Sequence, residues 1–345
     1  MKPKLSPFGV LQEQDIQWIL DQGIKRELAI GDILIEEGSY IHNLFIILDG
    51  TLSVFVSQQS EADRENPDQE IARITTGEIV GEISFLDKLP TSATVKSFEN
   101  SVVLSLSWQQ LSSKLNYDLG FASRFYQSLC ILLAERMRKI TFLLVSRKVL
   151  SNPPLRKVLF VFGILDDIDI DWIIATGKLL QYSPGTVLLQ QGETVESLYI
   201  LLEGKLSVFL EIIENEVKII KEVAQLPQGE IVGEMSFVET GKASATVKAS
   251  AISLLWTIPQ QKLRSKLDND MGFASRFYRA ITVVITDRLR ERMISRGYRK
   301  VAYIQSQAVS ENMEDEDELN LDTLENTALA ATRFNWLLKQ VRNSY

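Results

Sequence analysis

The sequence predicts a mainly β protein with α-helices, built as two tandem antiparallel β-barrels of the jelly-roll type, each followed by long helices. Three observations lead to this fold class. The 345-residue chain contains an internal duplication. Each copy holds short strand patterns separated by glycines. Each copy also ends in a long stretch with apolar residues at helical spacing.

The duplication is clearest in the glycine pattern. Gly50, inside LFIILDGTLSVF, matches Gly204, inside LYILLEGKLSVF, at a spacing of 154 residues. After a loop of unequal length, Gly81 matches Gly233 at a spacing of 152. We therefore expect one domain at residues 5–150, a second at 155–300, an acidic linker at 301–322 and an amphipathic helix at 323–345.

Within each copy the elements follow a fixed order. A short helical lead-in, LQEQDIQWIL in the first copy, precedes strand patterns bounded by glycines, and the polar spacer at 58–69 is expected to form an exposed hairpin loop. Two more strand patterns follow. A long helical pattern then runs from about 109 to 150 in the first copy and from 260 to about 300 in the second. Two prolines in the join SNPPL stop the first of these helices.

The composition excludes several classes of site. The chain has one cysteine, Cys130, and one histidine, His42, so neither a disulfide framework nor a Cys/His metal site is expected. A catalytic histidine would have to be His42, which lies in the turn-like stretch GSYIHN and is interpreted as a solvated loop residue. We predict no catalytic residue and no enzyme.

Length and charge patterns bear on location and partners. No apolar run approaches the roughly 20 residues of a membrane helix, and the N-terminus lacks a signal-peptide core, so a cytoplasmic protein is expected. The net charge of -8 comes from Glu311–Glu325, which holds eight acidic residues and no basic ones. The remaining chain is neutral, and therefore no nucleic-acid partner is expected.

One motif occurs in both copies. The first copy has GEIVGEISFLDKLPTSATV from Gly77, and the second has GEIVGEMSFVETGKASATV from Gly229. Together with the glycine-bounded strands and long helices, this motif resembles the cyclic nucleotide-binding domain family, which includes the regulatory subunit of protein kinase A and the catabolite activator proteins. The resemblance covers about 300 residues in two tandem copies.

The resemblance implies a phosphate-binding cassette between the Gly-Glu pair and the Ala-Thr pair of each motif. In the family a short helix N-terminus faces the cyclic phosphate, the glutamate accepts hydrogen bonds from the ribose hydroxyl, and small residues let the phosphate approach the backbone. A cyclic nucleotide is thus the implied ligand, and no other cofactor is expected. The implied ligand-binding residues are Gly81, Glu82, Ser92, Ala93, Thr94, Gly233, Glu234, Ser244, Ala245 and Thr246.

Both motifs depart from the family at one position. The family has an arginine directly before the small residues, where it neutralises the phosphate. Thr91 and Ala243 stand there in this chain, and neither carries charge. Loss of one partner of a close charge pair costs roughly 2–5 kcal/mol, so affinity for cyclic AMP should fall by about 30-fold to several thousand-fold. Glu82 and Glu234 then have two interpretations, namely ligand contact or stabilisation of a helix N-terminus.

The C-terminal region offers two further predictions. The basic run Thr286–Lys300 is either a solvated helix face or a surface on which the acidic segment folds back. The last helix either docks on a partner protein or packs on its own chain. The residues assigned to docking are Phe334, Trp336, Leu337 and Leu338.

These features favour a non-enzymatic regulatory or adaptor protein, a scaffold or docking protein with weak or lost cyclic AMP binding. One alternative is a sensor that holds a cyclic nucleotide or another small ligand in the barrel pockets. Self-assembly into a homo-oligomer through the long helices is a third possibility. A DNA-binding regulator is the weakest alternative, because no helix-turn-helix pattern follows the second copy.

Overall fold

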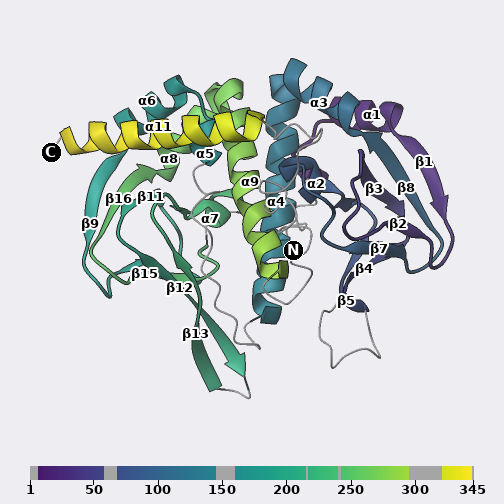
Figure 1. Ribbon diagram of the computed structural model, residues 1–345, viewed down its shortest axis with the longest axis horizontal. Coiled ribbons are helices and arrows are strands. Elements are labelled where there is room, and N and C mark those ends of the chain that lie inside the picture. The colour runs from purple at the N-terminus through teal and green to yellow at the C-terminus, as the bar shows by residue number, and fades with distance from the viewer. Residues whose placement is uncertain are drawn as a thin grey trace, which may run out of the picture. The chain divides into compact units, whose positions relative to one another are not determined.

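The computed structural model describes residues 7–57, 68–144, 160–214, 217–239, 242–294 and 321–343 (Figure 1). The chain forms two compact units. The first consists of residues 1–132 and 286–319, and the second of residues 133–285 and 320–345. The first unit therefore contains the first repeat up to Leu132, together with the last part of the helix that follows the second repeat.

Within the described residues, the first repeat opens with a short 3-10 helix and α1, continues through eight strands with the short helix α2 between β6 and β7, and ends with two helices. Its elements are η1 (Pro7–Val10), α1 (Glu13–Gln22), β1 (Ile24–Leu28), β2 (Ile33–Ile35), β3 (Asn43–Asp49), β4 (Thr51–Ser57), β5 (Asp68–Thr75), β6 (Ile79–Val80), α2 (Glu82–Asp87), β7 (Thr94–Ser97), β8 (Ser101–Ser107), α3 (Trp108–Tyr117) and α4 (Leu119–Leu144).

The second repeat has the same order of elements and is followed by a C-terminal helix. Its elements are α5 (Phe160–Ile164), α6 (Asp167–Thr176), β9 (Lys178–Tyr182), β10 (Val187–Leu189), β11 (Ser197–Glu203), β12 (Leu206–Glu214), β13 (Val217–Leu226), β14 (Ile231–Val232), α7 (Glu234–Glu239), β15 (Thr246–Ala249), β16 (Ser253–Pro259), α8 (Gln260–Asn269), α9 (Met271–Ile294) and α11 (Leu321–Asn343). The acidic linker predicted at 301–322 lies almost wholly outside the described residues.

The strands of each repeat form two four-stranded antiparallel sheets. In the first repeat the orders are β1-β8-β3-β6 and β2-β7-β4-β5, and the second repeat has the equivalent orders β9-β16-β11-β14 and β10-β15-β12-β13. The predicted jelly-roll fold class is therefore confirmed, with two sheets per repeat among the described strands. β4 and β5 pair antiparallel from Thr51 with Thr75 to Ser57 with Asp68. Asp68 and Gln69, predicted as loop, belong to β5, and the rest of the predicted loop lies outside the described residues.

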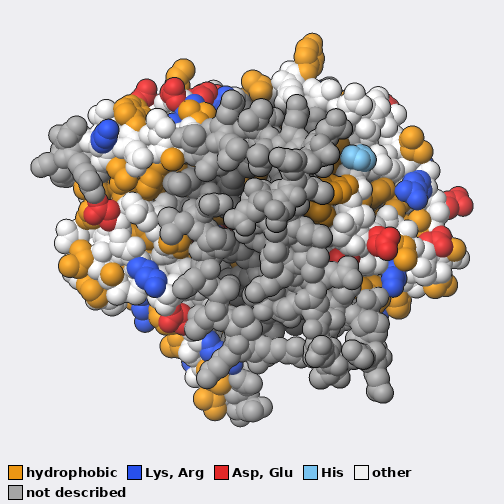
Figure 2. Space-filling view, viewed as in Figure 1, with side chains coloured by type: hydrophobic (Ala, Val, Ile, Leu, Met, Phe, Trp, Pro, Cys, Tyr) orange, Lys and Arg blue, Asp and Glu red, His pale blue; other side chains and the backbone are white. Residues whose placement is uncertain are grey.

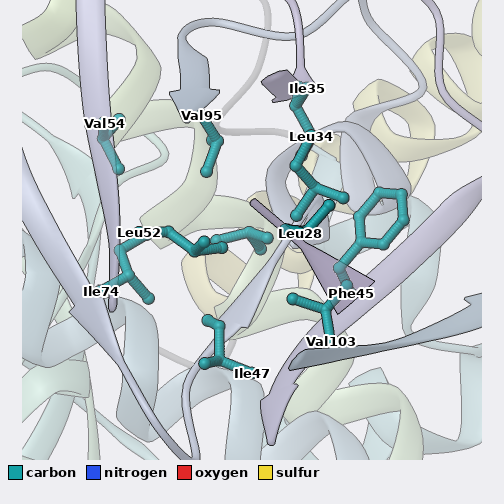
Figure 3. Close-up of a cluster of buried hydrophobic side chains, with 11 residues drawn as sticks. Leu28, Leu34, Ile35, Phe45, Ile47, Leu52, Val54, Ile74, Val95 and Val103 are labelled. Carbon is teal, nitrogen blue, oxygen red and sulfur yellow. The ribbon is translucent and has the colours of Figure 1, made fainter. Parts of the chain in front are cut away.

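The core of the first repeat lies between its two sheets. Inward-pointing residues of the strands form a cluster of buried side chains that are aliphatic except for Phe45 (Figure 3). Each fully buried side chain of this size contributes roughly 1.5–3 kcal/mol. The members of the cluster are Leu28, Leu34, Ile35, Phe45, Ile47, Leu52, Val54, Ile74, Val80, Val95 and Val103.

The long helical pattern that follows each barrel forms two helices in the structure. Asp118 separates α3 from α4, and Asp270 separates α8 from α9. The Asp118 carboxylate accepts hydrogen bonds from the Phe121 backbone N–H and from Lys114, both at 2.9 Å. It thus caps the new helix, and these bonds hold the pKa of Asp118 below its usual value.

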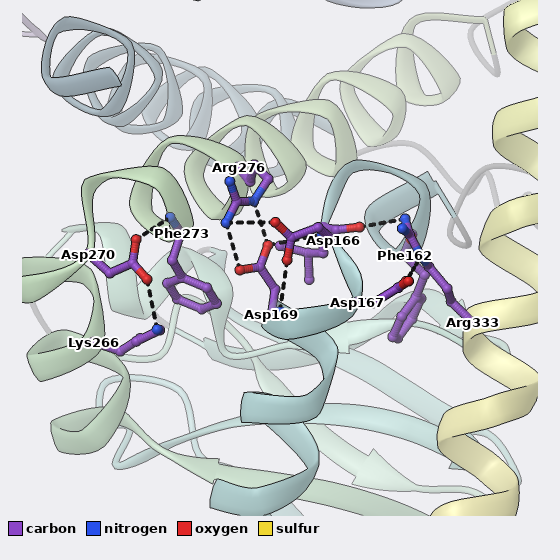
Figure 4. Close-up of polar contacts among 10 residues, drawn as sticks. Phe162, Asp166, Asp167, Asp169, Lys266, Asp270, Phe273, Arg276 and Arg333 are labelled. Atoms are coloured by element: carbon purple, nitrogen blue, oxygen red, sulfur yellow. Dashed lines mark hydrogen bonds and ion pairs between the residues drawn. The ribbon is translucent and has the colours of Figure 1, made fainter. Parts of the chain in front are cut away.

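An arginine in each long helix forms an ion pair with an aspartate in the first α-helix of ten residues in its repeat, α1 or α6. Arg124 of α4 donates to both carboxylate oxygens of Asp15 in α1, at 2.6 and 2.8 Å. Burial opposes ionisation of Asp15, but hydrogen bonds from Arg124 and the Gln12 backbone outweigh it and lower the pKa. Arg276 and Asp169 form the equivalent pair in the second repeat, at 2.6 and 2.9 Å (Figure 4).

The C-terminal helix α11 packs against α5 and α6 of its own unit. Phe334 and Leu337 are buried there, and the rings of Phe334 and Phe162 lie 5.2 Å apart. Arg333 donates to the Asp167 carboxylate at 2.7 Å and to the backbone carbonyl of Phe162 at 3.0 Å (Figure 4). Packing on its own chain is thus what the structure shows for this helix. Docking on a partner through Trp336 and Leu338, which are half-buried, stays a prediction.

The described surface is mixed in character. On the face seen in Figure 2, described acidic and basic side chains are interspersed with apolar ones, and the chain's one histidine, His42, is exposed. Within the described residues, no helix has the length and apolar character needed to cross a membrane.

Candidate functional site

Each cassette begins at a position whose backbone conformation only glycine adopts without strain. Gly81 has a φ of 87° and precedes α2, and Gly233 has a φ of 92° and precedes α7. A Cβ on Gly81 would lie 2.9 Å from Ile41 Cδ1 and 3.1 Å from the Asn43 carbonyl. The backbone therefore turns tightly into a short helix at both positions, as the motif predicts.

The glutamates that follow the two glycines are buried. Glu82 is 2% exposed and Glu234 is 4% exposed, and both occupy the first position of a cassette helix. An anionic side chain at a helix start is stabilised by the helix dipole and by the first backbone N–H groups. This placement agrees with both interpretations of these residues, contact with a ligand hydroxyl and support of the helix.

Thr91, which stands in the place of the family arginine, is built into a turn of its own repeat. Its hydroxyl donates to the Glu36 carbonyl and accepts from the Ser39 N–H at 3.1 Å. Its backbone N–H donates to the Ser39 carbonyl at 2.9 Å, and its carbonyl accepts from Gly38 at 2.9 Å. Thr91 is 7% exposed, so both its side chain and its backbone are committed to the turn at 36–39.

Ala243 occupies the equivalent place in the second repeat. Its N–H donates to the Glu193 carbonyl at 2.8 Å, and its carbonyl accepts from Gly192 at 2.9 Å. The methyl group is 4% exposed and belongs to the apolar core cluster of the second repeat. The two repeats thus share the same backbone bonds to a turn between their second and third strands. They differ only in how the side chain fills the space.

The threonines that follow complete this connection. Thr94 Oγ1 accepts from the Glu37 N–H at 3.0 Å, and Thr246 Oγ1 accepts from the Gln191 N–H at 3.1 Å. Because each hydroxyl bonds to the turn of its own repeat, the presence of a threonine at these two positions has a structural reason besides contact with a ligand. The small residues between them and the arginine position are half-buried; they are Ser92, Ala93, Ser244 and Ala245.

One residue at the first cassette was not identified from the sequence. Arg290 of α9 donates to both carboxylate oxygens of Asp87, at 2.6 and 3.0 Å, and to the Pro90 carbonyl at 2.9 Å. Asp87 is the last residue of the cassette helix, and Pro90 directly precedes Thr91. The Arg290 and Asp87 side chains are 8% and 15% exposed, so this is a buried, bidentate pair.

The Arg290 contact corrects the interpretation of the basic run Thr286–Lys300. For Arg290 a solvated helix face does not hold, because the residue is 7% exposed and its guanidinium bonds to the first cassette. Pairing of the basic run with the acidic segment stays a prediction. The acidic segment itself lies outside the described residues. No local pattern pointed to Asp87, which is 203 residues away along the chain.

The motif, the fold and the paired repeats agree with a comparison to family models. The model described as the cyclic nucleotide-binding domain matches residues 25–118 and 179–270, which together make up more than half of the chain. The chain belongs to the cyclic nucleotide-binding domain family. The two matched segments contain the two cassettes, one in each cyclic nucleotide-binding domain.

Known relatives match about 70% of the chain at low identity. A cAMP-dependent protein kinase type II regulatory subunit from Drosophila melanogaster is 22% identical over 243 residues, covering 70% of this chain and 54% of that protein. A cGMP-dependent protein kinase from Plasmodium berghei (strain Anka) is 22% identical over 239 residues, covering 69% of this chain and 23% of that protein. The chain thus spans about half or less of these relatives.

A solved structure with similar domains is the regulatory subunit of a cAMP-independent protein kinase A from Trypanosoma cruzi bound to guanosine. It is 20% identical with a TM-score of 0.29, and the match covers 78% of this chain and 86% of that one.

Proposed function

We propose that this chain is a non-enzymatic regulatory protein of the scaffold or docking type, in which both cyclic nucleotide-binding domains keep their fold and have lost tight binding of cyclic AMP. One observation carries this function. The two positions that the family uses for its phosphate-binding arginine hold Thr91 and Ala243, which are buried and bonded to turns of their own repeats.

The loss of charge decides the expected affinity. A cyclic phosphate that enters a partly buried cassette loses water and needs a cation to replace it. At about 2–5 kcal/mol for a missing charge partner, affinity is expected to be about 30-fold to several thousand-fold below that of a cassette with arginine. In the first cassette, Arg290 is not expected to replace this cation, because the Asp87 carboxylate already balances its charge through two hydrogen bonds.

Thermal unfolding of the full chain with cyclic AMP and cyclic GMP tests the proposal. A ligand at 100 times its Kd adds about 2.7 kcal/mol to the stability of the state that binds it. We expect no shift in Tm at millimolar cyclic nucleotide. A clear, saturable shift at micromolar cyclic AMP would overturn the assignment.

A second candidate function is a sensor for a ligand that offers hydroxyl groups without a phosphate. The observation that favours it is the presence of a buried glutamate at the start of both cassettes, Glu82 and Glu234. In the family this residue receives the ribose hydroxyl, and a nucleoside needs no arginine. Adenosine and guanosine in the same thermal assay separate the two candidates, since only the sensor predicts a shift that Glu82→Gln or Glu234→Gln abolishes.

A further inference from the structure

The face of the second repeat that receives α11 has a counterpart in the first repeat. In the second repeat α11 packs against α5 and α6, with Phe334 and Leu337 buried in the contact. Arg333 anchors the helix by donating to the carboxylate of Asp167 and to the carbonyls of Phe162 and Leu165. Because the chain is duplicated, η1 and α1 occupy the place of α5 and α6 in the first repeat.

The acidic anchor of this face is retained in the first repeat. Glu13, at the first position of α1, corresponds to Asp167 at the first position of α6, 154 residues later. Leu11 corresponds to Leu165 at the same spacing, so the Leu11 carbonyl is the counterpart of the Leu165 carbonyl that accepts from Arg333. Glu13 is exposed in the structure. A basic side chain approaching this helix start would thus meet the same kind of acceptors that Arg333 meets on α6.

The two apolar positions that follow the acidic anchor on the same side of the helix are also retained, but they differ in exposure. Ile16 of α1 is 38% exposed, whereas its counterpart Ile170 of α6 is 0% exposed. Leu20 is 43% exposed, and its counterpart Ile174 is half-buried. Glu13, Ile16 and Leu20 lie three and four residues apart, so they form one stripe along α1.

We propose that this stripe of α1 (Glu13, Ile16 and Leu20) binds an amphipathic helix that resembles α11 and belongs to a partner protein. The helix carries an arginine followed directly by an aromatic residue, with a leucine three residues after the aromatic residue, as in Arg333, Phe334 and Leu337. The arginine pairs with Glu13, and the apolar residues cover Ile16 and Leu20. The stripe contains no cassette residue, so helix binding and nucleotide binding are measured independently.

The test uses the full chain and a fluorescent synthetic peptide with the sequence of residues 321–343. Fluorescence anisotropy measures binding of the peptide in trans, and circular dichroism confirms that each variant is folded. The chain variants are Glu13→Arg, the double variant Ile16→Ser with Leu20→Ser, and Asp167→Arg as the matched control in the second repeat. A second peptide carries Arg333→Glu.

We expect saturable binding that Glu13→Arg weakens by at least about fivefold, as expected for loss of one ion pair worth about 1 kcal/mol. The peptide with Arg333→Glu should restore binding to the Glu13→Arg chain, and the Ile16/Leu20 double variant should lose binding. Asp167→Arg should leave binding of the original peptide at Glu13 in place.

Three results would overturn the proposal. Absence of peptide binding at millimolar chain concentration would remove the site. Binding that responds to Asp167→Arg and not to Glu13→Arg would mean that the peptide exchanges with α11 on the second repeat. A chain that light scattering shows to be a dimer, and that Glu13→Arg converts to a monomer, would assign the stripe to a second copy of the chain and not to a partner protein.

Discussion

The buried pair between Arg290 and Asp87 makes a quantitative prediction for the first cassette. Replacing Arg290 by methionine keeps most of the apolar stem and removes the guanidinium, which leaves the Asp87 carboxylate without its bidentate partner. Both side chains are largely buried, at 8% and 15% exposed. Breaking one side of such a pair costs about 3–5 kcal/mol, because a charge remains in a poorly solvated place.

Hydrogen exchange of backbone amides in the first cassette measures this loss of stability locally. The cassette amides of Phe85, Lys88 and Thr91 donate to Gly81, Ser84 and Ser39 in the structure. Their exchange reports the free energy of opening this segment. At 1.4 kcal/mol per tenfold, the substitution should speed their exchange by roughly 100-fold to several thousand-fold. The Phe237 amide of the second cassette, which donates to Gly233, provides an internal reference.

Two controls make the measurement specific. Arg138 lies 152 residues before Arg290, at the equivalent position of α4, and is exposed, so Arg138→Met should cost at most about 1 kcal/mol. In a double-mutant cycle, adding Asp87→Asn to Arg290→Met should cost less than the sum of the two single changes, because the negative charge that Arg290 balances is then absent. Exchange that rises less than about fivefold, or equally for both arginine variants, would refute the role of the pair.

Three further predictions follow from the same geometry. Thr91→Val should lower the free energy of unfolding by about 1–3 kcal/mol, because the turn at 36–39 loses its hydroxyl partner, and urea unfolding of the full chain measures this loss. Gly81→Ala should destabilise the chain by more than Gly77→Ala in the same titration; both have positive φ, but only at Gly81 would a Cβ meet Ile41, at 2.9 Å. The pKa of Asp15 is lowered in the folded state, so its contribution to stability is complete above the unfolded pKa of about 4 and is lost as pH falls through the lower, folded value. Urea midpoints between pH 7 and 2 should therefore fall less for Asp15→Asn than for the unchanged chain.

The sequence predicted the fold and the cassette starts because these depend on local chemistry. Gly38 and Gly192 match across the repeats, and both have positive φ, at 80° and 82°. A left-handed turn needs glycine, so the pattern of glycines marks the turns directly. Strand patterns between them then determine the order of elements, which the two sheets of each repeat confirm.

The helix break at Asp118 shows a local signal that periodicity conceals. Apolar spacing continues from α3 into α4, so a count of apolar positions predicts one helix. Asp118 followed by Leu119 and Gly120 carries the contrary signal, because aspartate caps a new helix through the N–H three residues later. Attention to capping residues within a long helical pattern would have found the break.

The contacts of Arg290 and of α11, which join residues far apart in the sequence, could not be predicted from local patterns. Arg290 belongs to a run of basic residues whose charge pattern fits a solvated helix as well as a buried one. Likewise, the apolar spacing of α11 is the same whether the helix covers its own chain or a partner. For Arg290 only the three-dimensional contact with Asp87 shows that the side chain is not solvated. For α11 the contact of Phe334 with Phe162 shows packing on its own repeat, and docking on a partner stays a prediction.

Both cassettes lack the arginine, but the residues in its place have different surroundings. Restoring nucleotide binding should therefore be easier in one cassette than in the other. Thr91→Arg would lose the hydroxyl bonds to Glu36 and Ser39, while the backbone bonds of this residue to the turn would remain. Ala243→Arg would instead enlarge a methyl group that is packed in the apolar core cluster of its repeat, where both overpacking and a buried charge are costly. The first cassette is thus the place where one substitution should increase affinity for cyclic AMP, and a gain at the second cassette alone would contradict this reasoning.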